Sequence, residues 1–155
     1  MESDVGHSVS VAGVIVDDQG RVLVIQRQDN GRWEPPGGVL EPSEDIISGL
    51  RREIVEETGL EVVPQALTGV YKNMNRAIMA LVFQCRPSSG VLTAGPETSD
   101  LRWVAPADIP HLVTEAYAIR FLDAVRPQTP PPVRHHDGVH LLSETHHPAD
   151  RPNRA

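Results

Sequence analysis

The 155-residue chain has a single cysteine, Cys85, and that scarcity excludes two kinds of site. One cysteine cannot form an internal disulfide, and it cannot supply the paired cysteines of a Cys-x-x-Cys zinc motif. Cys85 ends the apolar run IMALVFQC, which favours a thiol buried in a strand over a catalytic nucleophile.

The chain also lacks a block of basic residues and a long apolar stretch. Its formal net charge is -7, so the electrostatic footprint of a nucleic-acid-binding protein is missing. No apolar run approaches the length of a membrane-spanning helix, and the N-terminal MESDVGHSVS has no basic or apolar leader region. We therefore expect a soluble cytoplasmic protein with a proper hydrophobic core and without nucleic-acid or membrane partners.

Carboxylates are concentrated in residues 37–60, GGVLEPSEDIISGLRREIVEETGL. In a helix, which turns by about 100° per residue, Glu53, Glu56 and Glu57 share one narrow arc. Three acids so close together repel one another unless a positive charge lies between them. Oxygen ligands suit a hard cation such as Mg²⁺ or Mn²⁺, whereas the competing interpretation is a solvated acidic face.

The spacing within this segment favours the metal site. From Gly38, it reads G-x5-E-x7-R-E-U-x-E-E-x-G-U, where U is an aliphatic residue. The specified positions are filled by Gly38, Glu44, Arg52, Glu53, Ile54, Glu56, Glu57, Gly59 and Leu60. This pattern resembles the Nudix box, the signature of the Nudix hydrolases, without a departure.

The resemblance implies an enzyme that splits the diphosphate linkage of a nucleoside diphosphate derivative with metal-activated water. Carried over by position, the metal ligands are Glu53, Glu56, Glu57 and the backbone carbonyl of Gly37. The metal is Mg²⁺, with Mn²⁺ as the alternative. Arg52 resembles the family arginine that holds the box glutamates, and Glu44 supports the same loop and helix.

The general base and the substrate contacts are less narrowly defined. The general base is either a box glutamate such as Glu57 or the later Glu97, and Asp100 competes with Glu97 for this role. Glu97 is equally compatible with a solvated loop acid that has no catalytic role. Arg27 and Arg32 flank the first loop and are candidates for phosphate binding, although each also suits a surface arginine. Trp33 either stacks on a base or ribose, or covers the core.

Two functions are compatible with the resemblance. The first is hydrolysis of a nucleotide sugar such as ADP-ribose, or of a nucleoside triphosphate. The alternative is a non-catalytic module that senses a nucleotide; such modules usually lose box glutamates, and this chain keeps them all. Family members are often dimers, so a homodimer is also considered.

Apolar periodicity predicts the order of elements. Strands over 8–16 and 21–26 are expected to form a hairpin, and a helix follows from Ser43 as N-cap to Gly59 as a left-handed C-cap. One or two strands, broken at Pro64, are expected over 60–63 and 67–71. Further strands are expected at 77–85 and 101–104, a loop at 86–90, a turn of helix at 106–109 and a helix at 114–125. The resulting fold class is α/β, a Nudix fold in which an α/β/α sandwich encloses a mixed β-sheet.

Composition divides the chain into a hydrolase domain at 1–126 and a Pro/His-rich arm at 127–155. The arm is expected to be partly disordered, or to pack on the domain or on a dimer partner. Its VRHHDGVHLL stretch has an Asp137-Gly138 turn typical of a small hairpin. His135, His136 and His140 are candidates for a metal site, but histidines in a Pro-rich arm are more often solvated.

Overall fold

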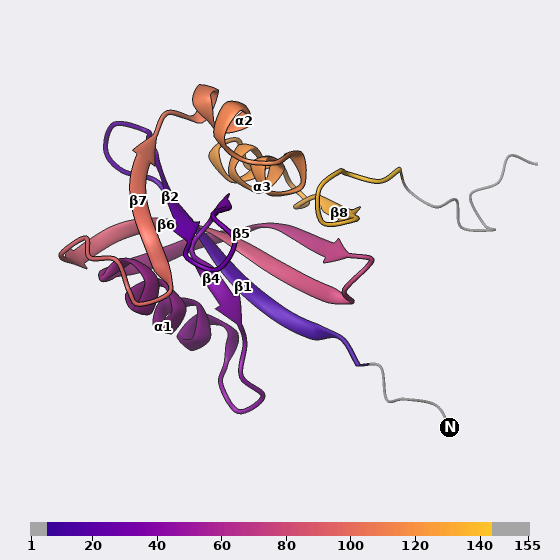
Figure 1. Ribbon diagram of the computed structural model, residues 1–155, viewed down its shortest axis with the longest axis horizontal. Coiled ribbons are helices and arrows are strands. Elements are labelled where there is room, and N and C mark those ends of the chain that lie inside the picture. The colour runs from indigo at the N-terminus through magenta and orange to yellow at the C-terminus, as the bar shows by residue number, and fades with distance from the viewer. Residues whose placement is uncertain (1–5, 144–155) are drawn as a thin grey trace, which may run out of the picture.

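A computed structural model describes residues 6–143, which fold into two sheets with helices packed around them (Figure 1). The larger sheet has the order β4-β1-β6-β5-β8, with strands at Gly37–Val39, Ser8–Ile15, Ile78–Gly90, Leu60–Asn73 and Val133–His136. The smaller sheet has the order β3-β2-β7, with strands at Trp33–Glu34, Val22–Arg27 and Thr98–Val104. The helices are α1 (Ile46–Thr58), α2 (Ile109–Leu112) and α3 (Glu115–Val125). A short 3-10 helix at Pro106–Asp108 leads directly into α2.

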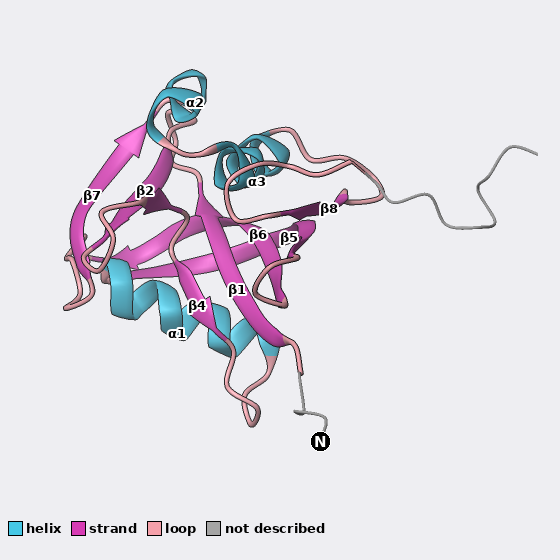
Figure 2. Ribbon diagram, turned by 45° about the vertical axis from the view of Figure 1, so that its right-hand side comes forward, coloured by secondary structure: helices cyan, strands magenta, loops and turns pink. Residues whose placement is uncertain are grey.

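The larger sheet lies between two helical layers. In Figure 2, α1 covers one face of this sheet, whereas α2 and α3 lie on the opposite side. Strand β6 pairs in parallel with β1 and antiparallel with β5, so the sheet is mixed. The predicted α/β/α sandwich with a mixed sheet is therefore confirmed.

Strand β1 shows how the sequence builds both halves of the core. Successive side chains of a strand point to opposite faces of the sheet. Val11 and Ile15 accordingly pack with Leu50 of α1, while Val14 on the other face packs with Phe121 of α3. All five residues are fully buried, which is why this strand is apolar almost throughout rather than alternating.

The predicted hairpin of the first two strands is wrong, although its turn is present. Asp17 accepts hydrogen bonds from the backbone N–H groups of Gln19 and Arg21, as a tight turn requires. The strands then meet at one bridge, Val16 to Val22, and separate into different sheets. The reason is that β1 already has β4 and β6 as neighbours, while β2 pairs with β3 and β7.

The two prolines that suggested breaks lie inside long strands. Strand β5 runs unbroken through Pro64, and β6 continues through Pro87 over the stretch predicted as a loop. Strand β1 pairs with β6 only as far as Cys85, and β8 pairs with β5 only from Val70 onward. Both prolines therefore lie where their strand has one neighbour, and register shifts occur beside them, so the missing N–H is tolerated.

Helix α1 begins later than the sequence suggested. Its N-cap is Asp45, whose carboxylate accepts from the backbone N–H of Ser48 at 2.8 Å, so the predicted Ser43 cap is wrong. Glu44 lies before the helix because its carboxylate is turned back to the N–H of Glu41 and to Arg52. The C-cap is correct: Gly59 has φ 76° and closes the helix in the left-handed conformation.

Other predictions agree with the structure. The run ending at Cys85 is the central strand β6, its thiol is fully buried, and burial raises the Cys85 pKa to about 12. The expected helical segments at 106–109 and 114–125 are present. No helix in the described range 6–143 is long and apolar enough to cross a membrane.

The described part of the arm docks onto the larger sheet. Strand β8 pairs in parallel with the end of β5, and Arg134 forms two hydrogen bonds of 2.9 Å with the buried carboxylate of Asp123 on α3. The chain then turns at Asp137 and Gly138, and Leu141 bridges back to His136. The last residues, for which disorder was predicted, lie outside the described range, and the domain boundary after Arg126 stays a prediction.

Candidate active site

Helix α1 carries the box carboxylates on a rigid base. Leu50 and Ile54 are fully buried against the sheet, which fixes how the helix is rotated about its own axis. This rotation turns Glu53 and Glu57 toward a cavity of about 570 Å³, while the Glu56 side chain is 58% exposed. The sequence predicted one shared arc for all three acids, and the structure brings two of them to one cavity.

Two glycines of β4 form the opposite wall of this cavity. The N–H of Gly37 donates to a carboxylate oxygen of Glu57 at 3.0 Å. A Cβ atom on Gly38 would lie 2.5 Å from the carboxylate of Glu53, so a side chain has no room there. The structure thus shows Gly37 touching Glu57 through its N–H group, and the predicted role of its carbonyl stays a prediction.

Arg52 ties three glutamates together from the side of the helix. It binds Glu44 in a bidentate manner, with Nη2 and Nε at 2.6 and 2.9 Å from the two carboxylate oxygens. Its Nη1 lies 3.0 Å from Glu53 and 3.3 Å from Glu56. These hydrogen bonds from Arg52 hold the pKa of Glu44 at about 2. Arg52 therefore orients carboxylates that would otherwise repel one another.

Glu57 has an unusually high proton affinity for a carboxylate. Burial raises its pKa from 4.5 to about 8; the charge of Glu53 adds to this rise, and the Gly37 N–H opposes it. Burial also raises the pKa of Glu53. Glu53 shares Arg52 with two other glutamates, and Glu57 has no cationic partner among residues 6–143. Two partly buried carboxylates with so little compensating charge are the arrangement that a bound metal ion would relieve.

The donor set fits a hard divalent cation, although a ready-made cluster is not present. Among residues 6–143, the side chains do not bring three or more His, Cys, Asp or Glu residues into metal-binding geometry. Glu53 and Glu56 face Arg52, and Glu57 faces Gly37. Carboxylates are the oxygen ligands that Mg²⁺ and Mn²⁺ prefer, and Glu53 and Glu57 both line the open cavity.

A pH dependence of metal binding follows from the pKa of Glu57. Since the pKa is raised above its usual value, Glu57 is mostly protonated at neutral pH in the metal-free protein, and a metal ion must displace that proton. We expect Mg²⁺ affinity to rise by up to about tenfold per pH unit between about pH 6 and pH 8, then to level off. Calorimetry in buffers of different ionisation enthalpy should detect about one proton released per ion near pH 7. An affinity that is constant over this range would contradict the assignment.

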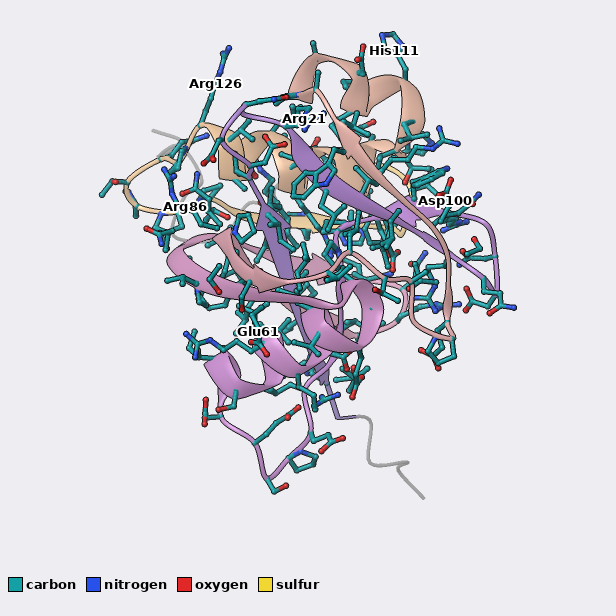
Figure 3. All side chains as sticks on the ribbon, turned by 90° about the vertical axis from the view of Figure 1, so that its left-hand side faces the viewer. Arg21, Glu61, Arg86, Asp100, His111 and Arg126 are labelled. Carbon is teal, nitrogen blue, oxygen red and sulfur yellow. The ribbon has the colours of Figure 1, made fainter. Side chains whose placement is uncertain are left out.

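Glu97 reaches the same cavity from another element. It lies immediately before β7, where its backbone carbonyl accepts from the N–H of Gln28 at 3.0 Å, and it lines the cavity with Glu53 and Glu57. Its competitor Asp100 does not line the cavity. Asp100 lies in β7 (Figure 3), and its carboxylate pairs with the exposed guanidinium of Arg102 at 3.3 Å. The structure therefore brings Glu97, and not Asp100, to the box carboxylates.

A second cavity of about 800 Å³ adjoins the first. Arg27 lines both cavities, and it is held by Asp29 at 2.7 Å and Glu34 at 3.2 Å. Arg32 lines the larger cavity only. The residues common to both cavities are Arg27, Asp29, Gly37, Gly38 and Val39. A ligand held beside the box thus has a connected space for its remaining part.

Trp33 is not brought to either cavity. It is partly buried against the core, and the guanidinium of Arg102 lies 4.5 Å from the centre of its ring. Tyr71 is fully buried and donates to Asp123, whereas Arg76 lines the larger cavity. The structure therefore places Trp33 where the sequence interpretation of a core-covering residue expected it.

The three histidines of the arm that were candidates for a metal site each contact a different group. His136 is fully buried, His135 contacts the backbone carbonyl of Ser143, and His140 lies 3.5 Å from Glu115. They form no metal cluster among the described residues.

Sequence reasoning missed part of the larger cavity. Its wall includes Asn73 and Asn75 near the β5–β6 turn, Tyr117 and Arg120 of α3, and the turn after β8. The apolar spacing in residues 114–125 predicted α3 and its core-facing residues, but it does not indicate which of its residues line a cavity. These residues meet through tertiary contacts, so no local signal in the sequence links them.

Comparisons with known proteins agree with this geometry. The NUDIX domain model matches residues 6–125. A MutT-like protein of Streptomyces ambofaciens is 52% identical over 136 residues, which cover 88% of each chain. An 8-oxo-dGDP phosphatase of Homo sapiens is 33% identical over 135 residues, which cover 85% of this chain and 36% of the human protein.

Solved structures show the same architecture. The crystal structure of a NUDIX hydrolase from Nitrosomonas europaea matches with a TM-score of 0.74 at 19% sequence identity. The match covers 86% of this chain and 82% of that chain. At this identity, the similarity shows a common fold.

Proposed function

The chain belongs to the Nudix family, and on this basis we propose that it hydrolyses a diphosphate linkage in a nucleoside diphosphate derivative. Members of this family act on small nucleotide derivatives and generally use divalent metal ions. We propose Mg²⁺ as the ion, with Mn²⁺ as the alternative. A cytoplasmic location and a homodimer remain parts of the same proposal.

The observation that carries the proposal is the pair of partly buried carboxylates, Glu53 and Glu57, which line one cavity with Glu97. Burial raises the pKa of Glu53 and of Glu57, so a cation bound in this cavity would stabilise their ionised forms. Arg52 supplies only part of that charge, because its guanidinium contacts Glu53 and not Glu57. A site that serves only to stabilise the fold would not need a second acid, Glu57, without a cationic partner among the described residues.

Separate residues would bind the metal ion, accept the proton of water and orient the carboxylates. Glu53, Glu56, Glu57 and the carbonyl of Gly37 would hold the metal ion, which when bound polarises the diphosphate and lowers the pKa of water. Glu57 or Glu97 would accept the proton of the attacking water. Arg52 keeps the carboxylates in position.

Arg27 is suited to the charged part of the substrate. It lies where the two cavities meet, and its pairs with Asp29 and Glu34 hold its guanidinium in place. Arg32 would add a second fork at the rim of the larger cavity. A diphosphate bound here would have its reacting bond near the box and its attached group in the larger cavity.

The nucleotide itself is proposed as a class. The 8-oxo-dGDP phosphatase activity of the human relative makes oxidised guanine nucleotides one candidate. The other candidates are ADP-ribose or another nucleotide sugar, and the nucleoside triphosphates. The alternative function is a nucleotide sensor without turnover. Retention of Glu44, Arg52, Glu53, Glu56 and Glu57 favours the enzyme.

A substrate panel tests the proposal. Purified protein is incubated with ADP-ribose, other nucleotide sugars, nucleoside triphosphates and 8-oxo-dGDP, with Mg²⁺ or Mn²⁺, and the products are separated by chromatography. We expect metal-dependent cleavage of at least one compound, abolished by a chelator. Tight binding of a compound without turnover of any of them would support the sensor instead.

A further inference from the structure

Arg120 of α3 is a buried cation that forms no ion pair with an acidic side chain of residues 6–143. Its residue is 7% exposed, and its guanidinium lies over the rings of Tyr71 and Tyr117, at 5.1 and 4.5 Å from their centres. Within residues 6–143, the hydrogen-bonding partner of its guanidinium is a ring nitrogen of His136, 3.1 Å from Nη2, and its Nε has none. Five N–H donors thus face very few acceptors.

His136 cannot satisfy Arg120 fully, because it has a second donor on its other side. The N–H of Gly138 lies 2.9 Å from Nδ1, while Arg120 lies beside Nε2. A neutral imidazole has one acceptor nitrogen, so it can accept from only one of the two donors. Protonation would worsen the conflict, in keeping with a His136 pKa that burial and then Arg120 lower to about 4.

Asp123, in the same helix, is a buried charge whose hydrogen-bonding groups do have partners. Asp123, one turn along α3, accepts from Tyr71 at 2.6 Å and from Arg134 in a bidentate manner. Glu34 shares the larger cavity with Arg120, but its ion pair is with Arg27. A buried charge without a counter-ion opposes folding, and residues 6–143 supply none to Arg120, which points to a ligand as its partner.

The position of Arg120 indicates which partner that is. Arg120 lines the larger cavity, and this cavity shares Gly37–Val39 of β4 with the cavity beside the box. The turn after β8 closes the cavity beside it, and the side chain of Asn75 donates to the carbonyl of Asp137 at 2.9 Å to hold that turn. A volume of about 800 Å³ is sufficient for a nucleoside.

We propose that Arg120 determines base specificity by donating hydrogen bonds to a carbonyl-bearing purine. This inference rests on the proposed function, which places the diphosphate beside the box and the nucleoside in the larger cavity. The exposed edge of guanine or hypoxanthine offers O6 and N7 as acceptors, and an arginine commonly reads this pair. Adenine has its N6 amino group in place of O6, so the N–H donors of Arg120 would face another donor.

The inference is tested by comparing GTP, ITP and ATP as substrates of the wild-type protein and of Arg120→Met. We expect kcat/KM for GTP and ITP to exceed that for ATP by roughly 10-fold or more, in line with the discrimination given by one good arginine–base contact. Arg120→Met should remove most of this preference by lowering GTP and ITP turnover while leaving ATP within about threefold. ITP lacks the 2-amino group of guanine, so its agreement with GTP isolates the O6/N7 edge.

Matched controls separate recognition from folding. Arg126→Met, at the exposed end of α3 (Figure 3), should leave all three substrates unchanged. Arg120→Met should keep or raise the midpoint of thermal unfolding, because it removes an unpaired buried charge without removing an ion pair. A lower midpoint together with an unchanged GTP to ATP ratio would overturn the inference in favour of a structural role.

Two further outcomes are decisive. An equal loss for GTP, ITP and ATP would show that Arg120 contacts a group common to all three, such as a phosphate, and would overturn the base assignment. If none of the three is turned over, the same ratio is measured as dissociation constants by calorimetry with Mg²⁺. Preferential GTP and ITP binding lost in Arg120→Met would then support the inference even if the proposed hydrolysis failed, and equal binding would overturn it.

Discussion

Replacing Glu57 by Gln is expected to reduce metal-dependent turnover by about 1,000-fold, within the range that loss of a general base brings. Gln keeps the shape of Glu and can still accept the hydrogen bond from the N–H of Gly37. It cannot carry the negative charge that a metal ion or a proton from water requires. The loss should therefore appear in kcat and in the Mg²⁺ titration, both measured by product formation at saturating substrate.

The fold should survive this change. Burial opposes the charge of Glu57 in the metal-free protein, so removing that charge should leave the unfolding midpoint unchanged or higher. The matched control is Glu61→Gln, an exposed glutamate at the start of β5 just beyond the box (Figure 3). Near-normal turnover of Glu57→Gln, at the level of this control, would refute the metal-site assignment.

Replacing Arg52 by Ala is expected to give the second-largest effect, a loss of roughly 10- to 100-fold in activity or metal affinity, as is usual when a residue that orients metal ligands is removed. Arg52 neutralises and aligns Glu44, Glu53 and Glu56 through hydrogen bonds of 2.6 to 3.4 Å. Without it, Glu53 loses the group that fixes its rotamer, and the like charges repel. The apparent Mg²⁺ constant should rise more than the KM for the nucleotide.

The adjacent arginine provides the control. Arg51 has the same charge and lies in the same helix, but its exposed side chain forms no ion pair within the described range. Arg51→Ala should therefore behave as wild type, and Arg52→Lys should fall between the two because a lysine cannot grip Glu44 with two parallel hydrogen bonds. Identical Mg²⁺ titrations for Arg51→Ala and Arg52→Ala would rule out the orienting role of Arg52.

The sequence predicted the box well because its chemistry is local. Residues three and four apart on a helix are neighbours in any fold, so Glu53, Glu56 and Glu57 could be grouped without knowing the sheet. The contact of Arg52 with Glu53 and Glu56 follows from the same spacing. Its tighter contact with Glu44 depends on the loop before α1 folding back.

The substrate side was harder to predict because it is assembled from distant segments. Trp33 stood out in the sequence as an aromatic beside glycines, yet it packs under Arg102. Arg120 attracted no notice, since its importance depends on the absence of a carboxylate beside it and on the turn after β8, which follows it by more than fifteen residues. Prolines at 64 and 87 suggested strand ends, because the sequence does not show which strand edges lack a neighbour.

Cleavage of the diphosphate by water is tested most directly by one product analysis in H₂¹⁸O. The wild-type protein is incubated with Mg²⁺ and each compound of the substrate panel, and the nucleotides recovered from each incubation are examined by mass spectrometry. We predict a nucleoside monophosphate and the phosphorylated remainder, with one ¹⁸O atom on one of the two phosphates and none when Mg²⁺ is chelated. Recovery of intact, unlabelled nucleotide from every compound that binds would contradict hydrolysis and leave a nucleotide sensor.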